Sequence, residues 1–285
     1  SSGGYSIPTA DQYVIARFPH LPAAVRGFGG SKSFDIHTVM NYITSNAKLL
    51  SNKLRMKLQT RSRDRYAYGL KKGKLHNGSL HRILHGDNPS ADKIFRQRIV
   101  STTLDTAITL LVDCSGSMAG SKFRMACSGA GLFAEALRPL NIKYSVLGFT
   151  NEEKRDDPLI WVFTDFNERV TTNELTDRFA VASGCLWENT DGDAIAYASH
   201  QLRLRNENRK VLLVLSDGSP AGRRHAGDIS NYTLQAVQHA EKSGIDIYGI
   251  GIMDTNVKYF YKKHIVVDNL TNLAPTILSI IDRSI

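Results

Sequence analysis

Residues 106–118 read TAITLLVDCSGSM, and this stretch decides the fold. Its first seven residues are mostly apolar and include β-branched side chains, as expected of a strand that is buried on both faces of a sheet. Asp113 ends the apolar run, and small, flexible residues follow it. Because a helical pattern comes next, at about residues 122–137, the stretch predicts a strand, a loop and a helix in a parallel α/β sheet.

The rest of the chain after residue 105 repeats this alternation. Further strands are predicted at residues 143–150, 158–164, 210–217, 245–252 and 264–268, and helices at about 191–204, at 231–243 and at the C-terminal end. Strands that are separated by helical segments need crossover connections, which place helices on both faces of the sheet. We therefore predict an α/β fold with a doubly wound, mostly parallel sheet.

Two predicted strands end in an aspartate at the same edge of this sheet. Asp113 ends the first strand, and Asp217 ends a later one. In such sheets ligands bind at the carboxyl ends of strands, near the point where the strand order reverses. A turn through Gly116 brings the hydroxyls of Ser115 and Ser117 to the side of the Asp113 carboxylate. Hard oxygen donors of this kind suit Mg²⁺, with Mn²⁺ or Ca²⁺ as alternatives.

A third loop supplies Thr190 and Asp191 just before a helix. Taken singly, each feature has a simpler explanation, since Asp, Ser and Thr side chains cap helix starts and Asp217-Gly is a common turn. The three loops taken together favour a metal site. Its predicted ligands come from Asp113, Ser115, Ser117, Thr190, Asp191 and Asp217.

Motifs of self-sufficient enzymes are missing from the sequence. It contains no GxxxxGK[ST] phosphate loop, no GxSxG nucleophile motif and no HExxH zinc motif. The nine histidines are scattered and form no pair at metal-binding spacing. We therefore predict no catalytic residues and no activity of the chain alone.

The charge is divided unevenly along the chain. Residues 1–104 carry 17 Lys and Arg against 5 Asp and no Glu, a net charge of +12, whereas residues 105–285 have a net charge of −3. Residues 1–34 are rich in Gly, Ser and Pro and are predicted to be an irregular lead-in. Residues 35–104 form a basic, largely helical extension, with a helix capped by Asp35 and a hairpin or strand–turn–helix element at 66–84.

Two loops carry a resemblance to a known family. DCSGSM (113–118), together with the VLSDG strand end (214–218), resembles the metal-ion-dependent adhesion site of von Willebrand factor A domains. The resemblance covers residues 105–285 and implies a doubly wound fold with Mg²⁺ held by Asp113, Ser115 and Ser117, and with Asp217 among or beside the ligands. The family pattern places a Thr in the middle loop. In NTDGDAI (189–195) Thr190 and Asp191 compete for that role.

A more specific resemblance extends upstream to about residue 50. The segments 108–118, 187–220, 257–270 and 58–84 are similar to the CobT family of cobaltochelatase subunits, which serve in cobalamin biosynthesis. The resemblance implies a non-catalytic adaptor that docks an AAA+ ATPase of the MoxR or CobS type, through a partner carboxylate that completes the metal site. A large chelatase subunit and further copies of the chain are possible members of the same complex.

Two other functions compete with this adaptor role. The basic extension, with Tyr66 and Tyr68, could follow the phosphates of a nucleic acid, although no nucleic-acid-binding motif is present. An adhesion-type A domain would bind an extracellular ligand. The absence of a signal peptide, of an apolar membrane span and of paired cysteines among Cys114, Cys127 and Cys185 favours a cytoplasmic protein with no membrane contact.

Overall fold

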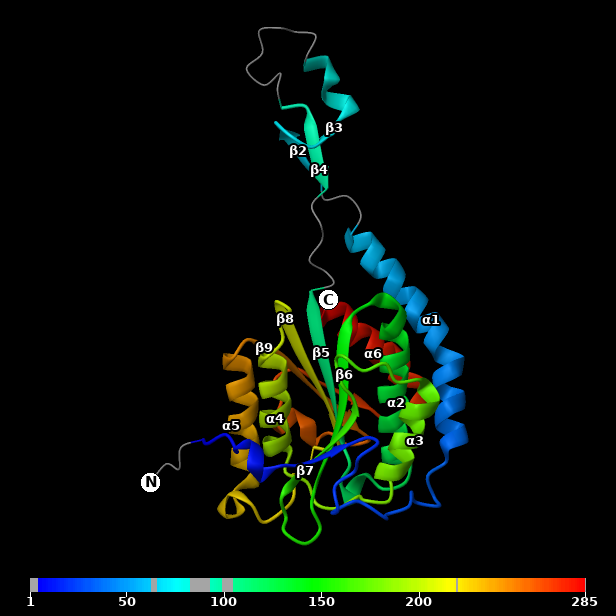
Figure 1. Cartoon of the computed structure of the whole chain (residues 1–285), viewed down its shortest axis with the longest axis vertical. Helices are drawn as coiled ribbons and strands as arrows, with labels where there is room; N and C mark the ends of the chain where they lie inside the picture. Colours follow the sequence, from blue (N-terminus) through cyan, green and yellow to red (C-terminus); the bar gives the residue numbers. More distant parts are fainter. Residues whose placement is uncertain (1–4, 63–65, 83–92, 99–104, 219, 285) are drawn as a thin grey trace. The chain divides into compact units, whose positions relative to one another are not determined.

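The computed structural model describes residues 5–62, 66–82, 93–98, 105–218 and 220–284 (Figure 1). The chain divides into two compact units, one made of Ser1–Leu54 with Asp105–Ile285 and the other of Arg55–Leu104. The first is the α/β unit, and the second is an insertion that begins within helix α1 (Ile36–Ser62) and ends before strand β5 (Thr106–Asp113). The two units are described separately below.

A seven-stranded sheet forms the centre of the α/β unit, in the order β1-β7-β6-β5-β8-β9-β10. Its strands are β1 (Val14–Arg17), β5 (Thr106–Asp113), β6 (Lys143–Asn151), β7 (Pro158–Thr164), β8 (Arg209–Ser216), β9 (Ile245–Ile252) and β10 (His264–Val267). Strands β6, β5, β8, β9 and β10 are parallel to one another, whereas β7 pairs antiparallel with β6. The predicted mostly parallel sheet is confirmed, with β5 buried along its whole length.

Helices cover both faces of this sheet (Figure 1). On one face lie α4 (Asp191–Arg203) and α5 (Ile229–Lys242), which contact each other. On the other lie α2 (Ser121–Leu137), α3 (Thr172–Ala182) and α6 (Leu270–Ser284), with α2 in contact with both of its neighbours. The doubly wound architecture is therefore confirmed. Among the described residues, no helix combines the length and apolar character needed to cross a lipid bilayer.

Residues 1–34, which were predicted to be irregular, contain one strand of the sheet, β1. Strand β1 pairs parallel with β7, so that Val14 lies opposite Leu159 and Arg17 opposite Val162. Ala16 is fully buried in this position. The structure thus differs from the prediction at residues 14–17, because a four-residue strand is too short to show a periodic pattern among the surrounding Gly and Pro.

Helix α1 (Ile36–Ser62) begins where the sequence predicts. The Asp35 carboxylate accepts a hydrogen bond from the Thr38 backbone N–H at 3.1 Å, as an N-cap residue does. The buried positions Val39, Ile43, Leu50 and Leu54 recur at the three- and four-residue spacing of one helix face. This apolar face joins the first part of α1 to the α/β unit, so the second unit begins at Arg55, whereas the sequence predicted that the extension begins at residue 35. The predicted end of the extension at residue 104 agrees with the structure.

Ile43 in α1 offers a direct test of this packing. Its side chain is 1% exposed, and a Cβ atom built at Gly131 of α2 would lie 2.2 Å from its Cδ1 atom, so the two helices are in close contact. We expect Ile43→Ala to lower the free energy of unfolding by about 2–5 kcal/mol. Leu49→Ala in the same helix, where the side chain is 58% exposed, is the control. Urea denaturation of both variants measures the difference, and equal effects would contradict the packing of α1 on α2.

The inserted unit contains a small antiparallel sheet in the order β2-β4-β3. Its strands are β2 (Tyr66–Leu70), β3 (Lys74–Leu75) and β4 (Phe95–Arg98), and a 3-10 helix spans Asn77–Arg82. The predicted element at 66–84 is present as β2, β3 and this short helix, whereas β4 was not predicted. Residues 83–92, which follow this short helix, lie outside the described residues.

Candidate metal centre

Three loops meet at the carboxyl ends of β5 and β8. Strand β5 pairs with β6 on one side and with β8 on the other, so the chain order reverses there, as the sequence predicts for a binding site. Asp113 is the last residue of β5, and Asp217 follows the last residue of β8. Asp191 is the first residue of α4. All three aspartates are 2% exposed or less, so this edge holds three buried carboxyl groups.

The DxSxS turn brings the hydroxyls of Ser115 and Ser117 together next to the end of β5. The Ser115 backbone N–H donates a hydrogen bond to Asp113 Oδ1 at 2.9 Å, and the Ser115 and Ser117 hydroxyls are 3.0 Å apart. Ser115 is buried and Ser117 is exposed. The two hydroxyls therefore lead from the buried carboxylate of Asp113 to solvent.

Ser216 connects two of the aspartates, and the sequence reasoning did not identify it. Its hydroxyl lies 2.9 Å from Asp113 Oδ2 and 3.2 Å from Asp191 Oδ2, and it accepts a hydrogen bond from the Gly218 N–H at 2.9 Å. One hydroxyl proton is thus shared between two carboxylates. The sequence feature that could have identified Ser216 is its hydroxyl, directly before Asp217 at the end of a strand that neighbours β5.

Thr190 and Asp191, the two candidate metal ligands in the middle loop, have different hydrogen-bond partners. Asp191 belongs to the network through Ser216, and its other carboxylate oxygen accepts a hydrogen bond from Asn189 Nδ2 at 2.6 Å. The Thr190 hydroxyl instead donates to Asn151 Oδ1 at 2.9 Å. The structure therefore brings Asp191 to Asp113, whereas Thr190 contacts the end of β6.

The carboxyl groups of this centre disfavour one another's charge. Burial, the largest cause, and the nearby carboxylate of Asp217 raise the pKa of Asp113 to about 6. Burial, together with Asp113 and Asp217, raises the pKa of Asp191 well above its ordinary value. The Lys122 ammonium lies 3.5 Å from Asp217 Oδ2 and offsets part of this negative charge. A positive ion bound close to these carboxylates would offset more of it.

The donor set decides which ion fits. Among the described residues, no group of three or more His, Cys, Asp or Glu side chains is arranged to hold a metal ion. An ion at this edge would therefore need the hydroxyls of Ser115 and Ser117 as well as the carboxylates. Hydroxyl and carboxylate oxygens, with water filling the remaining positions, are the ligands that Mg²⁺ takes in proteins. The residues present fit this ion.

Backbone contacts fix the two loops that carry these groups. The Gly116 N–H donates to the Trp187 carbonyl at 2.6 Å, and Ser115 forms a parallel bridge with Trp187. Gly218 has a φ of +73°, and a Cβ atom there would lie 2.5 Å from the Val257 nitrogen. Only glycine suits this position, because a side chain would collide with backbone and would strain the left-handed conformation.

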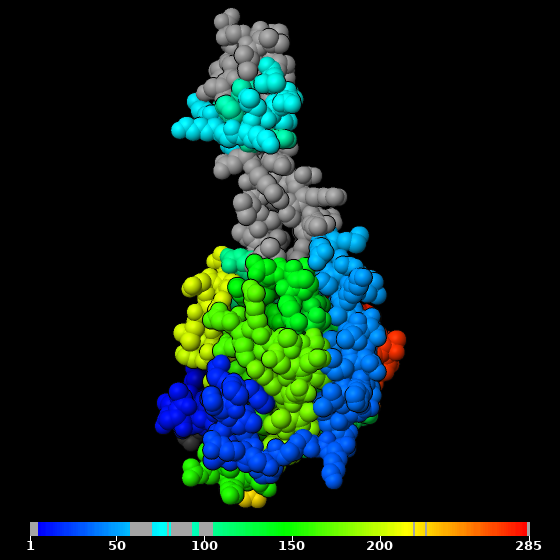
Figure 2. Space-filling view, turned by 45° about the vertical axis from the view of Figure 1, so that its right-hand side comes forward, coloured from blue at the N-terminus to red at the C-terminus, as the bar shows by residue number. Residues whose placement is uncertain are grey.

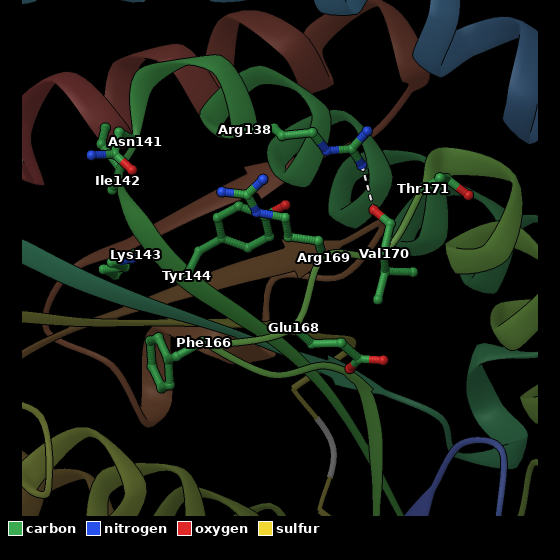
Figure 3. A pocket seen from close by; sticks show the side chains of 10 residues that line it. All are labelled: Arg138, Asn141, Ile142, Lys143, Tyr144, Phe166, Glu168, Arg169, Val170 and Thr171. Carbon is green, nitrogen blue, oxygen red and sulfur yellow. Dashed lines mark hydrogen bonds between the residues drawn. The ribbon is translucent and has the colours of Figure 1, made fainter.

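A separate cavity of about 360 Å³ lies away from the metal centre (Figure 3). Lys143 and Tyr144 line it from the amino end of β6, and Arg169 lines it from the loop that precedes α3. Arg138 is held at its edge by a hydrogen bond of 2.7 Å to the Val170 carbonyl. None of the predicted metal ligands lines this cavity.

The sequence contains three cysteines, which it predicts to be unpaired. Cys114, Cys127 and Cys185 are all buried and form no disulfide. Burial raises the pKa of each thiol above its ordinary value, so none is set up as a reactive thiolate.

Comparison with known structures shows the same fold in other proteins. The von Willebrand factor domain of the type V pili tip protein Mfa5 from Porphyromonas gingivalis aligns with a TM-score of 0.50 and 12% identity, over 62% of this chain and 94% of that one. The PilB minor pilin from Streptococcus sanguinis aligns with a TM-score of 0.51 and 15% identity, over 67% and 64% of the two chains. At these identities the likeness shows the fold alone.

Comparison of sequences gives a relative and a family. The chain is 27% identical to the uncharacterized protein YojO of Bacillus subtilis (strain 168) over 185 residues, which are 64% of this chain and 28% of YojO. The chain therefore spans little more than a quarter of YojO. The family model of the von Willebrand factor A domain of the cobalamin biosynthesis protein CobT matches residues 94–161 and 156–285, which is more than half of the chain. The chain thus belongs to the CobT family of von Willebrand factor A domain proteins.

Proposed function

We propose that the chain is a Mg²⁺-dependent adaptor that docks an AAA+ ATPase in a cobaltochelatase-like complex. The observation that carries this proposal is the set of buried carboxylates at the carboxyl edge of the sheet, which continues through two serine hydroxyls to solvent at Ser117. Membership of the CobT family supports a place in cobalamin biosynthesis, as a non-catalytic subunit beside a larger chelatase subunit in the cytoplasm.

Asp113, Ser115 and Ser117 would hold the ion, with Asp191 and Asp217 bound to it directly or through water. We prefer Asp191 to Thr190 in this role because Ser216 joins Asp191 to Asp113, whereas the Thr190 hydroxyl is bonded to Asn151. When bound, the ion supplies an electrophilic position that accepts a carboxylate oxygen from outside the chain. Ser117 marks the side from which such a group enters, since it is the exposed member of the DxSxS turn.

The chain's own groups bind and orient, and they carry out no chemistry. The Ser115 backbone N–H and the Ser216 hydroxyl both point at the Asp113 carboxylate and fix its orientation. The shared hydroxyl of Ser216 keeps Asp191 beside it. A rigid, partly dehydrated oxygen set of this kind favours an added carboxylate from a partner, because an aspartate or glutamate completes the coordination of the cation.

Partner capture tests this function directly. The chain is immobilised and presented with a purified MoxR- or CobS-type ATPase in Mg²⁺ and ATP, and bound ATPase is quantified. Because the ATPase itself needs Mg²⁺, the comparison is between wild type and Asp113→Ala in the same buffer. We expect the variant to lose capture, since the ion and the partner carboxylate share one site.

Asp177→Ala is the matched control, because Asp177 is exposed on α3 and lies outside the centre. This variant should capture the ATPase as the wild type does. Equal capture by wild type and Asp113→Ala would remove the proposed role of the ion in docking.

A further inference from the structure

Residues 25–34 contact two segments that adjoin the metal centre, although the family match begins only at residue 94. In Figure 2 this region, in dark blue, crosses the α/β unit towards helix α1. Val25 is fully buried, so the segment is anchored at its start. We call residues 25–34 the N-terminal brace.

The first contact of the brace is with the residue that holds the DxSxS turn. The ring of Phe28 meets the ring of Trp187 edge to face, with centroids 5.4 Å apart and an interplanar angle of 82°. The Trp187 carbonyl accepts the hydrogen bond from the Gly116 N–H, and Trp187 bridges to Ser115. Phe28 is thus linked through one intervening residue, Trp187, to the turn that carries Ser115 and Ser117.

Close backbone packing sets the position of Phe28. A Cβ atom at Gly30 would lie 2.4 Å from the Ala180 carbonyl oxygen, and one at Gly184 would lie 2.1 Å from the Gly29 carbonyl oxygen. The Ser31 N–H also donates to the Ser183 hydroxyl at 3.0 Å. The brace therefore lies directly against the end of α3 and the residues that follow it, with no room for a side chain at Gly30 or Gly184.

The far end of the brace contacts helix α2. Phe34 packs against Phe123 in the first turn of α2, with ring centroids 5.7 Å apart. The residue before Phe123 is Lys122, whose ammonium lies 3.5 Å from Asp217. The brace thus contacts Trp187, which is hydrogen-bonded to the DxSxS turn, and helix α2, which follows this turn.

We infer that the N-terminal brace is a positioning part of the metal centre: through Phe28 and Trp187 it fixes the DxSxS turn in the geometry that Mg²⁺ needs. This inference rests on the proposed function, since it presumes that the centre binds Mg²⁺. Mg²⁺ requires near-ideal octahedral geometry, whereas Ca²⁺ accepts a larger and more flexible oxygen set. Loosening the brace therefore weakens Mg²⁺ more than Ca²⁺, which general destabilisation of a folded chain does not do.

The test compares two glycine variants of the whole chain. Gly30→Ala pushes the brace away from Ala180, whereas Gly29→Ala adds a Cβ atom with nothing within 4 Å. Titration with MgCl₂ and separately with CaCl₂, followed by calorimetry, gives the affinities. We expect Gly30→Ala to weaken Mg²⁺ binding about tenfold, the usual scale for residues that orient ligands. Its Ca²⁺ affinity should change less, and Gly29→Ala should match the wild type for both ions.

The possible outcomes separate this inference from the proposed function. Mg²⁺ binding by wild type and Gly30→Ala with equal affinity overturns the role of the brace and leaves the metal centre standing. Equal loss of Mg²⁺ and Ca²⁺ affinity in Gly30→Ala also overturns it, whereas no Mg²⁺ binding by the wild type removes both proposals. If Gly30→Ala does not fold, Phe28→Leu takes its place, with the same expected selective loss of Mg²⁺.

Discussion

Asp113→Ala is expected to abolish the stabilisation of the chain by Mg²⁺. The wild type should unfold at a higher temperature in Mg²⁺ than in EDTA, because an ion that binds only the folded chain adds about 2.7 kcal/mol at a concentration one hundred times its Kd. Asp113 ends β5 at the centre of the site and is fully buried. Scanning calorimetry in the two buffers measures the shift, which should vanish in the variant.

The same variant should remain folded without metal. Burial and the nearby Asp217 carboxylate already disfavour the charge of Asp113, as its raised pKa of about 6 shows. Removing the group therefore removes a like-charge contact along with its hydrogen bonds. Asp177→Ala, on the exposed side of α3, should keep the full Mg²⁺ shift. A Mg²⁺ shift that persists in Asp113→Ala would show that the ion binds elsewhere.

Ser216→Ala is expected to destabilise the metal-free chain by about 1.5–3 kcal/mol, the range for hydrogen bonds to charged groups. The variant removes the one hydroxyl that Asp113 and Asp191 share, at 2.9 and 3.2 Å, and leaves both carboxyl groups buried. The comparison is made by urea denaturation in EDTA. Saturating Mg²⁺ should reduce the difference from wild type, because the ion then compensates the two carboxylates.

Ser145→Ala provides the matched control for this effect. Ser145 is also buried in the sheet, but its hydroxyl bonds to the neutral hydroxyl of Thr109 at 2.9 Å. Its loss should cost about 0.5–1.5 kcal/mol, the range for neutral pairs, with no dependence on Mg²⁺. Equal, Mg²⁺-independent effects of the two substitutions would show that Ser216 serves only as an ordinary core hydroxyl.

The sequence predicts best the strands that are buried on both faces of the sheet, because such strands are continuous runs of apolar residues. The strands at 158–164 and 245–252 have the predicted bounds, and helix α4 begins at Asp191 as expected. The DxSxS turn was also foreseeable, because a strand that ends in Asp113 places the following hydroxyls at the carboxyl edge. A local pattern was sufficient in each case.

The parts that the sequence did not predict depend on contacts between distant residues. Strand β1 is stabilised by pairing with β7, about 145 residues later, which no local period reveals. Helix α3 was not predicted either, since its buried face has only Leu175, Thr176, Phe179 and Ala182 within eleven residues. The role of Ser216 follows from the neighbouring positions of β5 and β8, which the order of the residues alone does not give.

Strands β1 and β10 are the two edges of the seven-stranded sheet, and each is only four residues long. Short edge strands present few free backbone groups to another molecule and so protect a protein from edge-to-edge aggregation. Behind β1 lies β7, which is buried throughout and includes the fully buried Trp161. A chain trimmed to the family-matched residues 94–285 would expose β7 as a long apolar edge, so β1 protects the sheet from self-association.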